Sequence, residues 1–445
     1  MKLNTKQIIN YIRGIIWHAC RAIYIFVPLP DDTKEKIYRR LSSRLTWILN
    51  SNKNDEVQNT STYKEYIKEL LNRENQGEIN QYISWRENKP FGNAPVKILA
   101  FYLPQFHAIP ENDAWWGEGF TEWTNVKPAQ PQFEGHYQPH IPGELGYYNL
   151  LDTNVQKRQV ELAKNYGIGG FCFHFYWFNG KRLLETPIEN YLKNPQLDLP
   201  FCISWANENW TRRWDGMENE VLISQHHSCE DDLAFIEHLS NYMRDDRYIR
   251  INGKPLVMVY RPGLLPDAKE TAERWRKWCS DNGIGEIYLA YVQSFDKINP
   301  DGYGYDAAIE FPPNNFYPPL ISNLITPLDR NFRGYVYDWQ TLVSFRERNA
   351  LPSYKLFRCV CPSWDNTPRR KNESTVFLNS SPGEFGKWVY NSLADTCKRF
   401  ENPDERILFV NAWNEWAEGA YLEPDEKYGY AFLQQIYNGL RKFSD

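Results

Sequence analysis

Short, nearly continuous apolar runs recur along the second part of the chain, and polar segments separate them. Such a run is typical of a strand that is buried on both faces. Eight occur, at Val96–Leu103, Gly169–Phe175, Pro200–Trp205, Pro255–Tyr260, Glu286–Val292, Asp306–Glu310, Lys355–Cys361 and Arg406–Trp413. Segments with apolar residues at helical spacing lie between several of these runs, at Val155–Tyr166, Asp231–Arg244, Ala268–Asp281 and Glu384–Arg399. This alternation predicts an α/β fold, a closed (β/α)₈ TIM barrel.

An open, doubly wound sheet is the alternative architecture for the same alternation. Its nucleotide-binding form needs a glycine-rich phosphate loop after a strand. No GxGxxG or GxxxxGK[ST] motif follows any of the eight runs. We therefore expect a barrel domain over residues 96–445.

Residues 1–95 differ from the barrel part and predict a helical N-terminal region with a linker. Apolar residues recur at helical spacing from Ile8 to Ile16, and a further helical pattern follows Asp31 and Asp32. Residues 1–50 hold nine Lys or Arg against three acids, a balance of +6, which leaves −11 for the other 395 residues. A basic amphipathic segment suits an anionic membrane surface. A helical hairpin that packs on the barrel or on a partner protein is the alternative.

Composition adds an excess of aromatic residues, with 17 Trp and 29 Tyr among the 445 residues. A buried Trp needs a partner for its N–H, so a core does not require this many, whereas sugar clefts use flat rings. The net charge of −5 gives no support for nucleic-acid binding. Arg13 and Arg21 interrupt the apolar N-terminal stretch, so it predicts neither a signal peptide nor a membrane span. We expect a cytoplasmic protein with reduced thiols, peripheral to the inner membrane if its basic segment binds lipid.

Functional residues of a (β/α)₈ barrel collect at the C-terminal ends of the strands and in the loops that follow. Here polar and aromatic residues alternate at nearly every such position, as in a cleft that binds sugar rings and hydroxyls. The candidate substrate-binding residues are His107, Trp123, His174, Tyr176, Trp177, Trp205, Asn207, Glu208, Arg213, Trp214, Tyr260, Glu310, Trp364, Trp413 and Asn414. A core rich in Trp explains the aromatic members equally well.

Two glutamates after the last strand are the candidate catalytic acids, because glycoside chemistry needs a pair of carboxyl groups. Glu415 and Glu418 are three residues apart, and in a helical first turn their Cβ atoms would be about 5–6 Å apart. That closeness should raise the pKa of one carboxyl and leave the other ionised. Alternatively, the two acids only complement a helix dipole, and Glu208 and Glu310 are rival acids at other strand ends.

Several motifs, in order, resemble the WbsX-type proteins of bacterial O-antigen and capsule gene clusters, over about residues 96–435. They are Phe101–His107, Gly119–Asn125, Gly135–His140, Gly169–His174, Trp205–Glu208, Arg213–Gly216 and Asn411–Glu418. More distantly, the chain is similar to the endo-α-1,2-mannosidases of glycoside hydrolase family 99, which are (β/α)₈ barrels.

The resemblance to the mannosidases implies a retaining reaction at an α-glycosidic linkage. Their Asn-Glu-Trp-x-Glu motif supplies both catalytic acids and is matched here by Asn414–Glu418. By this match, Glu415 draws the proton from the sugar's 2-hydroxyl, whose oxygen attacks its own anomeric carbon. Glu418 protonates the leaving oxygen and then activates water or an alcohol. The resemblance implies no metal and no cofactor.

Three functions remain open from the sequence. The first is a glycoside hydrolase or transglycosidase that acts on a bacterial surface polysaccharide or on a lipid-linked glycan. The second is a metal-independent glycosyltransferase of O-antigen assembly, and no DxD motif occurs for a metal-dependent one. The third is a non-catalytic barrel that binds glycans, against which the presence of both Glu415 and Glu418 argues.

Overall fold

The computed structural model describes residues 81–212, 217–315, 320–340, 342–343 and 351–444, all within the compact unit Arg73–Asp445. The helices expected before residue 75 and the basic segment 1–50 lie outside these residues. The division of the chain expected at residue 95 stays a prediction. None of the described helices is both long and apolar enough to cross a membrane.

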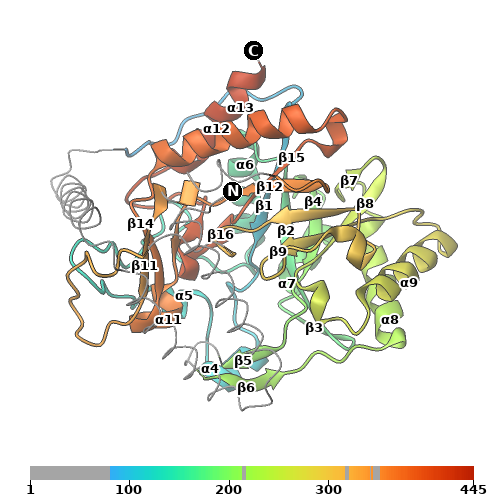
Figure 1. The fold of residues 1–445 in the computed structure, drawn as a ribbon, viewed down its shortest axis with the longest axis horizontal. Helices are drawn as coiled ribbons and strands as arrows, with labels where there is room; N and C mark the ends of the chain where they lie inside the picture. Colours follow the sequence, from blue (N-terminus) through green and yellow to red (C-terminus); the bar gives the residue numbers. More distant parts are fainter. Residues whose placement is uncertain (1–80, 213–216, 316–319, 341, 344–350, 445) are drawn as a thin grey trace, which may run out of the picture. The chain divides into compact units, whose positions relative to one another are not determined.

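Eight parallel strands close into a barrel (Figure 1). They are β1 (Lys97–Tyr102), β2 (Gly170–Phe178), β4 (Phe201–Trp205), β8 (Lys254–Val259), β9 (Tyr288–Gln293), β10 (Ala307–Glu310), β12 (Leu356–Val360) and β15 (Ile407–Val410). The ring closes because β1 pairs with β2 on one side and with β15 on the other. Each predicted run overlaps one of these strands, so the expected (β/α)₈ barrel is confirmed.

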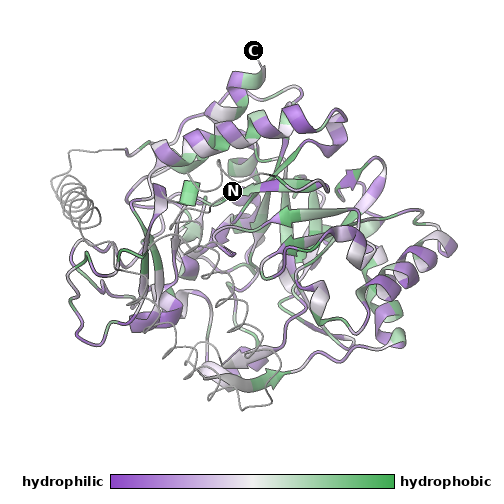
Figure 2. Cartoon of the chain, viewed as in Figure 1, coloured by the Kyte–Doolittle hydropathy of each residue, from purple (hydrophilic) through white to green (hydrophobic). Residues whose placement is uncertain are grey.

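The strands are buried along nearly their whole length, as expected for strands with apolar residues on both faces. All six residues of β9 and all four of β15 are buried. Figure 2 shows hydrophobic residues on the central strands and mostly hydrophilic residues on the outer helices. The barrel therefore has one layer of packing inside the ring of strands and a second layer between the strands and the outer helices.

Helices cover the outside of the barrel. Those flanking it are α6 (Thr153–Asn165), α7 (Thr186–Lys193), α8 (Cys229–Met243), α9 (Ala268–Asp281), α12 (Pro382–Arg399) and α13 (Ala431–Ser444). The four expected helices correspond to α6, α8, α9 and α12. Each of these four begins after a side chain that accepts a hydrogen bond from a first-turn N–H, those of Asp152, Ser228, Asp267 and Ser381.

Longer insertions follow the C-terminal ends of several strands and so gather at one mouth of the barrel. After β1 come α4 (Pro110–Trp116) and α5 (Trp123–Val126), and after β4 comes the hairpin of β5 (Trp210–Arg212) and β6 (Met217–Ile223). A small sheet joins β11 (Tyr335–Asp338), β14 (Thr375–Leu378) and β13 (Trp364–Asp365), and α11 (Thr367–Arg370) follows β13. After β15, β16 (Asn414–Glu415) pairs with β17 (Ala420–Tyr421).

The segment from residue 81 to residue 94 is held against α6 and α13. Arg86 Nε donates to Gln434 Oε1 at 2.8 Å, and the backbone N–H of Asn88 donates to Asn165 Oδ1 at 2.9 Å. A backbone bridge also joins Ile83 to Gly429.

Candidate active site

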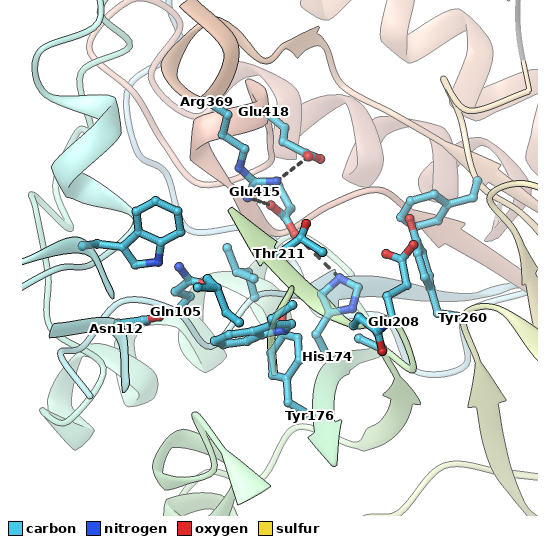
Figure 3. A pocket seen from close by; sticks show the side chains of 17 residues that line it. Gln105, Asn112, His174, Tyr176, Glu208, Thr211, Tyr260, Arg369, Glu415 and Glu418 are labelled. Carbon is cyan, nitrogen blue, oxygen red and sulfur yellow. Dashed lines mark hydrogen bonds and ion pairs between the residues drawn. The ribbon is translucent and has the colours of Figure 1, made fainter. Parts of the chain in front are cut away.

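A cavity of about 220 Å³ opens among the insertions at the C-terminal ends of the strands (Figure 3). Six of the predicted site residues line it, and they are His174, Tyr176, Glu208, Tyr260, Glu415 and Glu418. They come from β2, from the ends of β4 and β8, and from the segment after β15. The rule that function collects at this mouth of a barrel therefore located the cavity.

Other lining residues were not among those predicted from the sequence. The polar and aromatic members are Gln105, Asn112, Trp116, Asn209, Trp210, Thr211, Phe311 and Arg369. Most of them belong to insertions rather than to barrel strands, so no strand pattern pointed to them. The tandem arginines after the seventh predicted strand were the available signal for Arg369.

Glu415 and Glu418 reach the cavity from a tight turn. The two acids were expected in the first turn of an α-helix, and this expectation is wrong. Trp416–Glu418 instead forms a single 3₁₀ turn that connects β16 to β17. Gly419 ends this turn at a φ of 62°, and a Cβ atom there would lie 2.9 Å from the backbone nitrogen of Asp365. A hairpin with this close approach leaves no room for a longer helix.

Arg369 joins the two acids through its guanidinium. Its Nη2 donates to Glu415 Oε2 at 2.8 Å and to Glu122 Oε1 at 2.8 Å, and its Nη1 donates to Glu418. Glu122 is fully buried, and the same Oε1 accepts from the backbone N–H of Ala417 at 3.1 Å. One cation therefore holds both candidate acids on one side of the cavity.

The environment of Glu415 favours its neutral form. The pKa of Glu415 is raised to about 8, most of all by burial. Arg369 lowers it, and the charges of Glu418 and Glu122 raise it. The expected rise is thus present, but burial contributes more than the second acid of the pair. Burial also lowers the pKa of His174 to about 4, so its imidazole is neutral at pH 7. His174 Nε2 lies 3.7 Å from Glu415 Oε1.

A buried hydrogen-bond network fixes the turn from behind. Asn414 does not line the cavity, because its amide donates to Leu103 O at 3.0 Å and accepts from Leu103 N–H at 2.8 Å. Trp416 Nε1 donates to Glu423 at 2.7 Å, and Tyr148 OH donates to the same carboxylate oxygen at 2.9 Å. Burial raises the pKa of Glu423 to about 7. Sequence reasoning missed Glu423, which lies beyond the matched motif.

Two predicted tryptophans face the helices instead of the cavity. Trp177 Nε1 donates to Asp231 of α8 at 2.8 Å, and Trp205 stacks on Phe235 of the same helix with ring centroids 4.4 Å apart. Successive residues of a strand point to opposite sides, so Trp177 faces outward where Tyr176 faces the cavity. These two tryptophans are therefore part of the core, which was the alternative to a role in sugar binding.

Two more tryptophans are also part of the packing. Trp123 lies between Phe106 and Trp416, and its Nε1 donates to Tyr148 O at 2.8 Å. Trp413 is buried against Phe171, with ring centroids 5.0 Å apart. Both support the turn that carries the acid pair, without lining the cavity.

Three polar candidates do not line the cavity. Asn207 exchanges two hydrogen bonds of 2.8 Å with the backbone of Arg261, and so joins the ends of β4 and β8. Glu310 is buried and pairs with Arg358 at 3.0 Å, which removes this rival acid from the cavity. His107 is buried beside the loop after β1, and burial lowers its pKa to about 4.

Trp364 lies outside the main cavity. Trp364 lines a separate, smaller cavity of about 70 Å³ with His136 and His140. Arg213 and Trp214 fall outside the described residues. Among the described residues, no cluster of three or more His, Cys, Asp or Glu side chains is placed to hold a metal ion.

Residues 98–436 match the family described as glycosyltransferase WbsX. The chain belongs to this family. Two relatives from Xanthomonas campestris pv. campestris, strains B100 and ATCC 33913, are each named uncharacterized protein WxcX and are 49% and 50% identical to it. The alignments cover 82% and 79% of this WbsX-family chain but 52% and 50% of the relatives. The chain therefore spans about half the length of the curated relatives it matches.

Solved structures are similar in fold. One described as a glycoside hydrolase-like protein has a TM-score of 0.51 at 15% identity, over 81% of the WbsX-family chain and 98% of its own. The family 99 endo-α-mannosidase from Bacteroides thetaiotaomicron has a TM-score of 0.48 at 13% identity, over 78% and 97%. The first similarity agrees with the barrel described above, and it concerns fold alone.

Proposed function

We propose that this chain is a carbohydrate-active enzyme of bacterial surface polysaccharide metabolism. In this proposal it cleaves or transfers an α-glycosidic linkage with retention, through Glu415 and Glu418. The observation that carries the proposal is the placement of both carboxyl groups, bridged by Arg369, in one cavity at the functional mouth of the barrel. The match of Asn414–Glu418 to the Asn-Glu-Trp-x-Glu motif supports it.

The remaining lining suits a glycan. Figure 3 shows Gln105 and Asn112 on one side of the acids and Glu208 and Tyr260 on the other, so polar groups are available to sugars on both sides of the pair. Trp116 and Trp210 add flat apolar faces, against which sugar rings can stack. A cleft with binding groups on both sides fits an oligosaccharide or a lipid-linked glycan.

The two acids take the roles that the motif implies. Glu415 accepts the proton of the 2-hydroxyl as that oxygen attacks the anomeric carbon, and Glu418 gives a proton to the departing oxygen. In the second step Glu418 removes a proton from the incoming water or alcohol, whose oxygen opens the 1,2-anhydro ring, and Glu415 returns the proton to the 2-oxygen. Configuration is retained because the anomeric carbon is attacked twice.

Glycosyl transfer in O-antigen assembly is the second candidate function, and the description of the family favours it. In this alternative an activated donor supplies the sugar, and the same acid pair assists its transfer to an acceptor hydroxyl without a metal ion. A non-catalytic, glycan-binding barrel is the weaker alternative, since such a protein has no need for two bridged acids in its cavity.

The test is product analysis with purified protein. The protein is incubated with host surface oligosaccharide alone, and separately with nucleotide-sugar donors and an acceptor, and products are followed by mass spectrometry. We expect shortened or rearranged glycans without donor, and a loss of activity of about 10²-fold or more in Glu415→Gln and in Glu418→Gln. Glu144→Gln, which alters an exposed carboxylate outside the cavity, is the matched control.

Two results would change the conclusion. Extension that requires a donor and both glutamates would establish the transferase, whereas full activity in both variants would remove the acid pair from the mechanism. A pH profile tests the pair. The reaction needs one proton on the two acids, and the free protein holds it on Glu415, so kcat/KM should fall as pH rises through about 8. A rise of kcat/KM through that range would instead mean that the pair reacts only after its proton is lost to solvent, and would contradict these roles.

A further inference from the structure

Arg369 contacts three carboxylates, two that line the cavity and one that does not. Towards the cavity it donates to Glu415 and Glu418, and away from the cavity it donates to Glu122. Glu122 does not line the cavity and is fully buried. A ligand in the cavity can therefore contact Arg369 and the two acids. Glu122 contacts the guanidinium but is not part of the cavity lining.

Glu122 is also tied to the turn itself. Its Oε1 accepts from the N–H of Ala417, which lies between the two acids in the sequence, at 3.1 Å. The same oxygen accepts from Arg369 Nη2 at 2.8 Å. A single carboxylate thus fixes the guanidinium relative to the backbone that carries Glu415 and Glu418.

The protonation of the pair depends on the groups that face it. The titratable and charged groups acting on Glu415 come from β2, α11, the 3₁₀ turn and the loop after β1, and they are His174, Tyr176, Arg369, Glu418 and Glu122. Burial leaves His174 neutral at pH 7, so it offers no charge to the pair. The cation in contact with both acids is Arg369, and Glu122 holds it there.

We propose that Glu122 and Arg369 form a positioning pair that decides which of the two acids carries their shared proton. This inference rests on the proposed paired-acid function. In the free protein Arg369 Nη1 donates to Glu418 as a carboxylate, and Glu415 keeps the proton. When a glycan binds, the proton leaves the Glu415 carboxyl and joins a Glu418 oxygen, and Nη1 releases Glu418.

This transfer takes up no proton from solvent and releases none. Afterwards Arg369 Nη2 still lies between Glu122 and the new Glu415 carboxylate, and its charge stabilises that carboxylate. Glu418 is then the acid and Glu415 the base, as the reaction requires. Without the charge of Glu122, the guanidinium pairs more strongly with Glu415, and the resting proton is lost from that residue.

Glu122→Gln tests the pair, because it keeps an acceptor oxygen for Arg369 and Ala417 but removes the charge. Carboxyl carbon-13 NMR titration of the free protein follows Glu415, whose signal is assigned by its absence in Glu415→Gln. We expect the midpoint for Glu415 to shift downward in Glu122→Gln, with kcat lowered about 10-fold or more and KM changed less than about 2-fold. Asp232→Asn is the control, since it neutralises another buried carboxylate that pairs with an arginine, Arg274, away from the cavity.

An unchanged midpoint in Glu122→Gln would overturn the inference, whatever happens to activity. A shifted midpoint with unchanged kcat would also overturn it, because the proton would then have no part in the reaction. Equal effects in Asp232→Asn would point to a general loss of structure and would contradict it too. If Glu415→Gln and Glu418→Gln keep full activity, the proposed function fails separately, and the titration still decides whether Glu122 controls the charge of the pair.

Discussion

Glu415 shows how strongly one residue depends on the protein around it. Burial raises its pKa from 4.5 to about 8. Between these values the folded chain keeps a proton that the unfolded chain releases, so the free energy of unfolding falls as pH rises through this window. We expect Glu415→Gln, which cannot ionise, to raise Tm by about 2 °C or more at about pH 9 and to leave it nearly unchanged at about pH 5.

Thermal unfolding at the two pH values measures this difference. Glu144→Gln serves as the reference for loss of an exposed carboxylate. An equal Tm difference between Glu415→Gln and the unchanged protein at both pH values would mean that ionisation of Glu415 does not destabilise the folded state. The raised pKa would then be contradicted.

The sequence predicted correctly that some residues line the cavity and was wrong for others, for a physical reason. The sequence locates Tyr176 and Trp177 at the same strand end, but the residues of β2 around them are nearly all buried. Where both faces of a strand are covered, hydropathy does not alternate, and nothing in the pattern distinguishes the cavity side from the helix side. For that reason Trp177 and Trp205 were expected in the cavity and instead lie beneath α8.

At the scale of elements, the hairpin of β16 and β17 depends on its attachment to β1. Asn414 makes the link, with two hydrogen bonds to the backbone of Leu103 and one of 3.3 Å to Tyr148 OH. Asn414→Ala leaves these buried groups without partners, at about 1–3 kcal/mol for each group left unsatisfied. We expect lower stability, seen as a reduced urea midpoint with an unchanged m-value, together with lower kcat as Glu415 moves.

Asn149→Ala is the control for this element-scale prediction, because Asn149 is exposed and makes one local hydrogen bond, to Leu151 N–H. Its urea midpoint should change much less. If Asn414→Ala changes KM but not stability, then Asn414 binds substrate, as the sequence first indicated, and the anchoring role is wrong.

Elements with a local signal were predictable, and those fixed by distant partners were not. Each barrel strand is a short apolar run, and the four expected helices follow a capping side chain, so a window of about ten residues contains the evidence. Arg369 is different. Its α11 has four residues, and its place in the cavity depends on Glu122, which is 247 positions away in the sequence.

At the scale of the whole molecule, charge is unevenly distributed along the chain, with +6 in residues 1–50 and −11 in the rest. We propose that the basic segment brings the protein to the anionic inner membrane, where lipid-linked glycans are displayed. The full-length protein should co-sediment with phosphatidylglycerol vesicles at low salt, and should be released at about 1 M salt, where charges are screened within about 3 Å.

Phosphatidylcholine vesicles are the uncharged comparison. A variant in which Arg13, Arg21, Lys34 and Lys36 are replaced by Gln should bind phosphatidylglycerol vesicles more weakly. Equal binding to both lipids, or full binding by this variant, would contradict a membrane role and favour a protein partner for the segment.

The pairing of β1 with β15 also has a consequence for how the protein is made. The first barrel strand leaves the ribosome long before its last neighbour is synthesised, about 15–60 s earlier at bacterial elongation rates of ~5–20 residues per second. During that interval one edge of β1, apolar and without its strand partner, is a template for pairing with another chain. The proposed acid pair follows β15, so the barrel brings these residues together only after its last strand has been made. Until β15 is made, contact between these early strands and other nascent chains therefore carries a risk of aggregation.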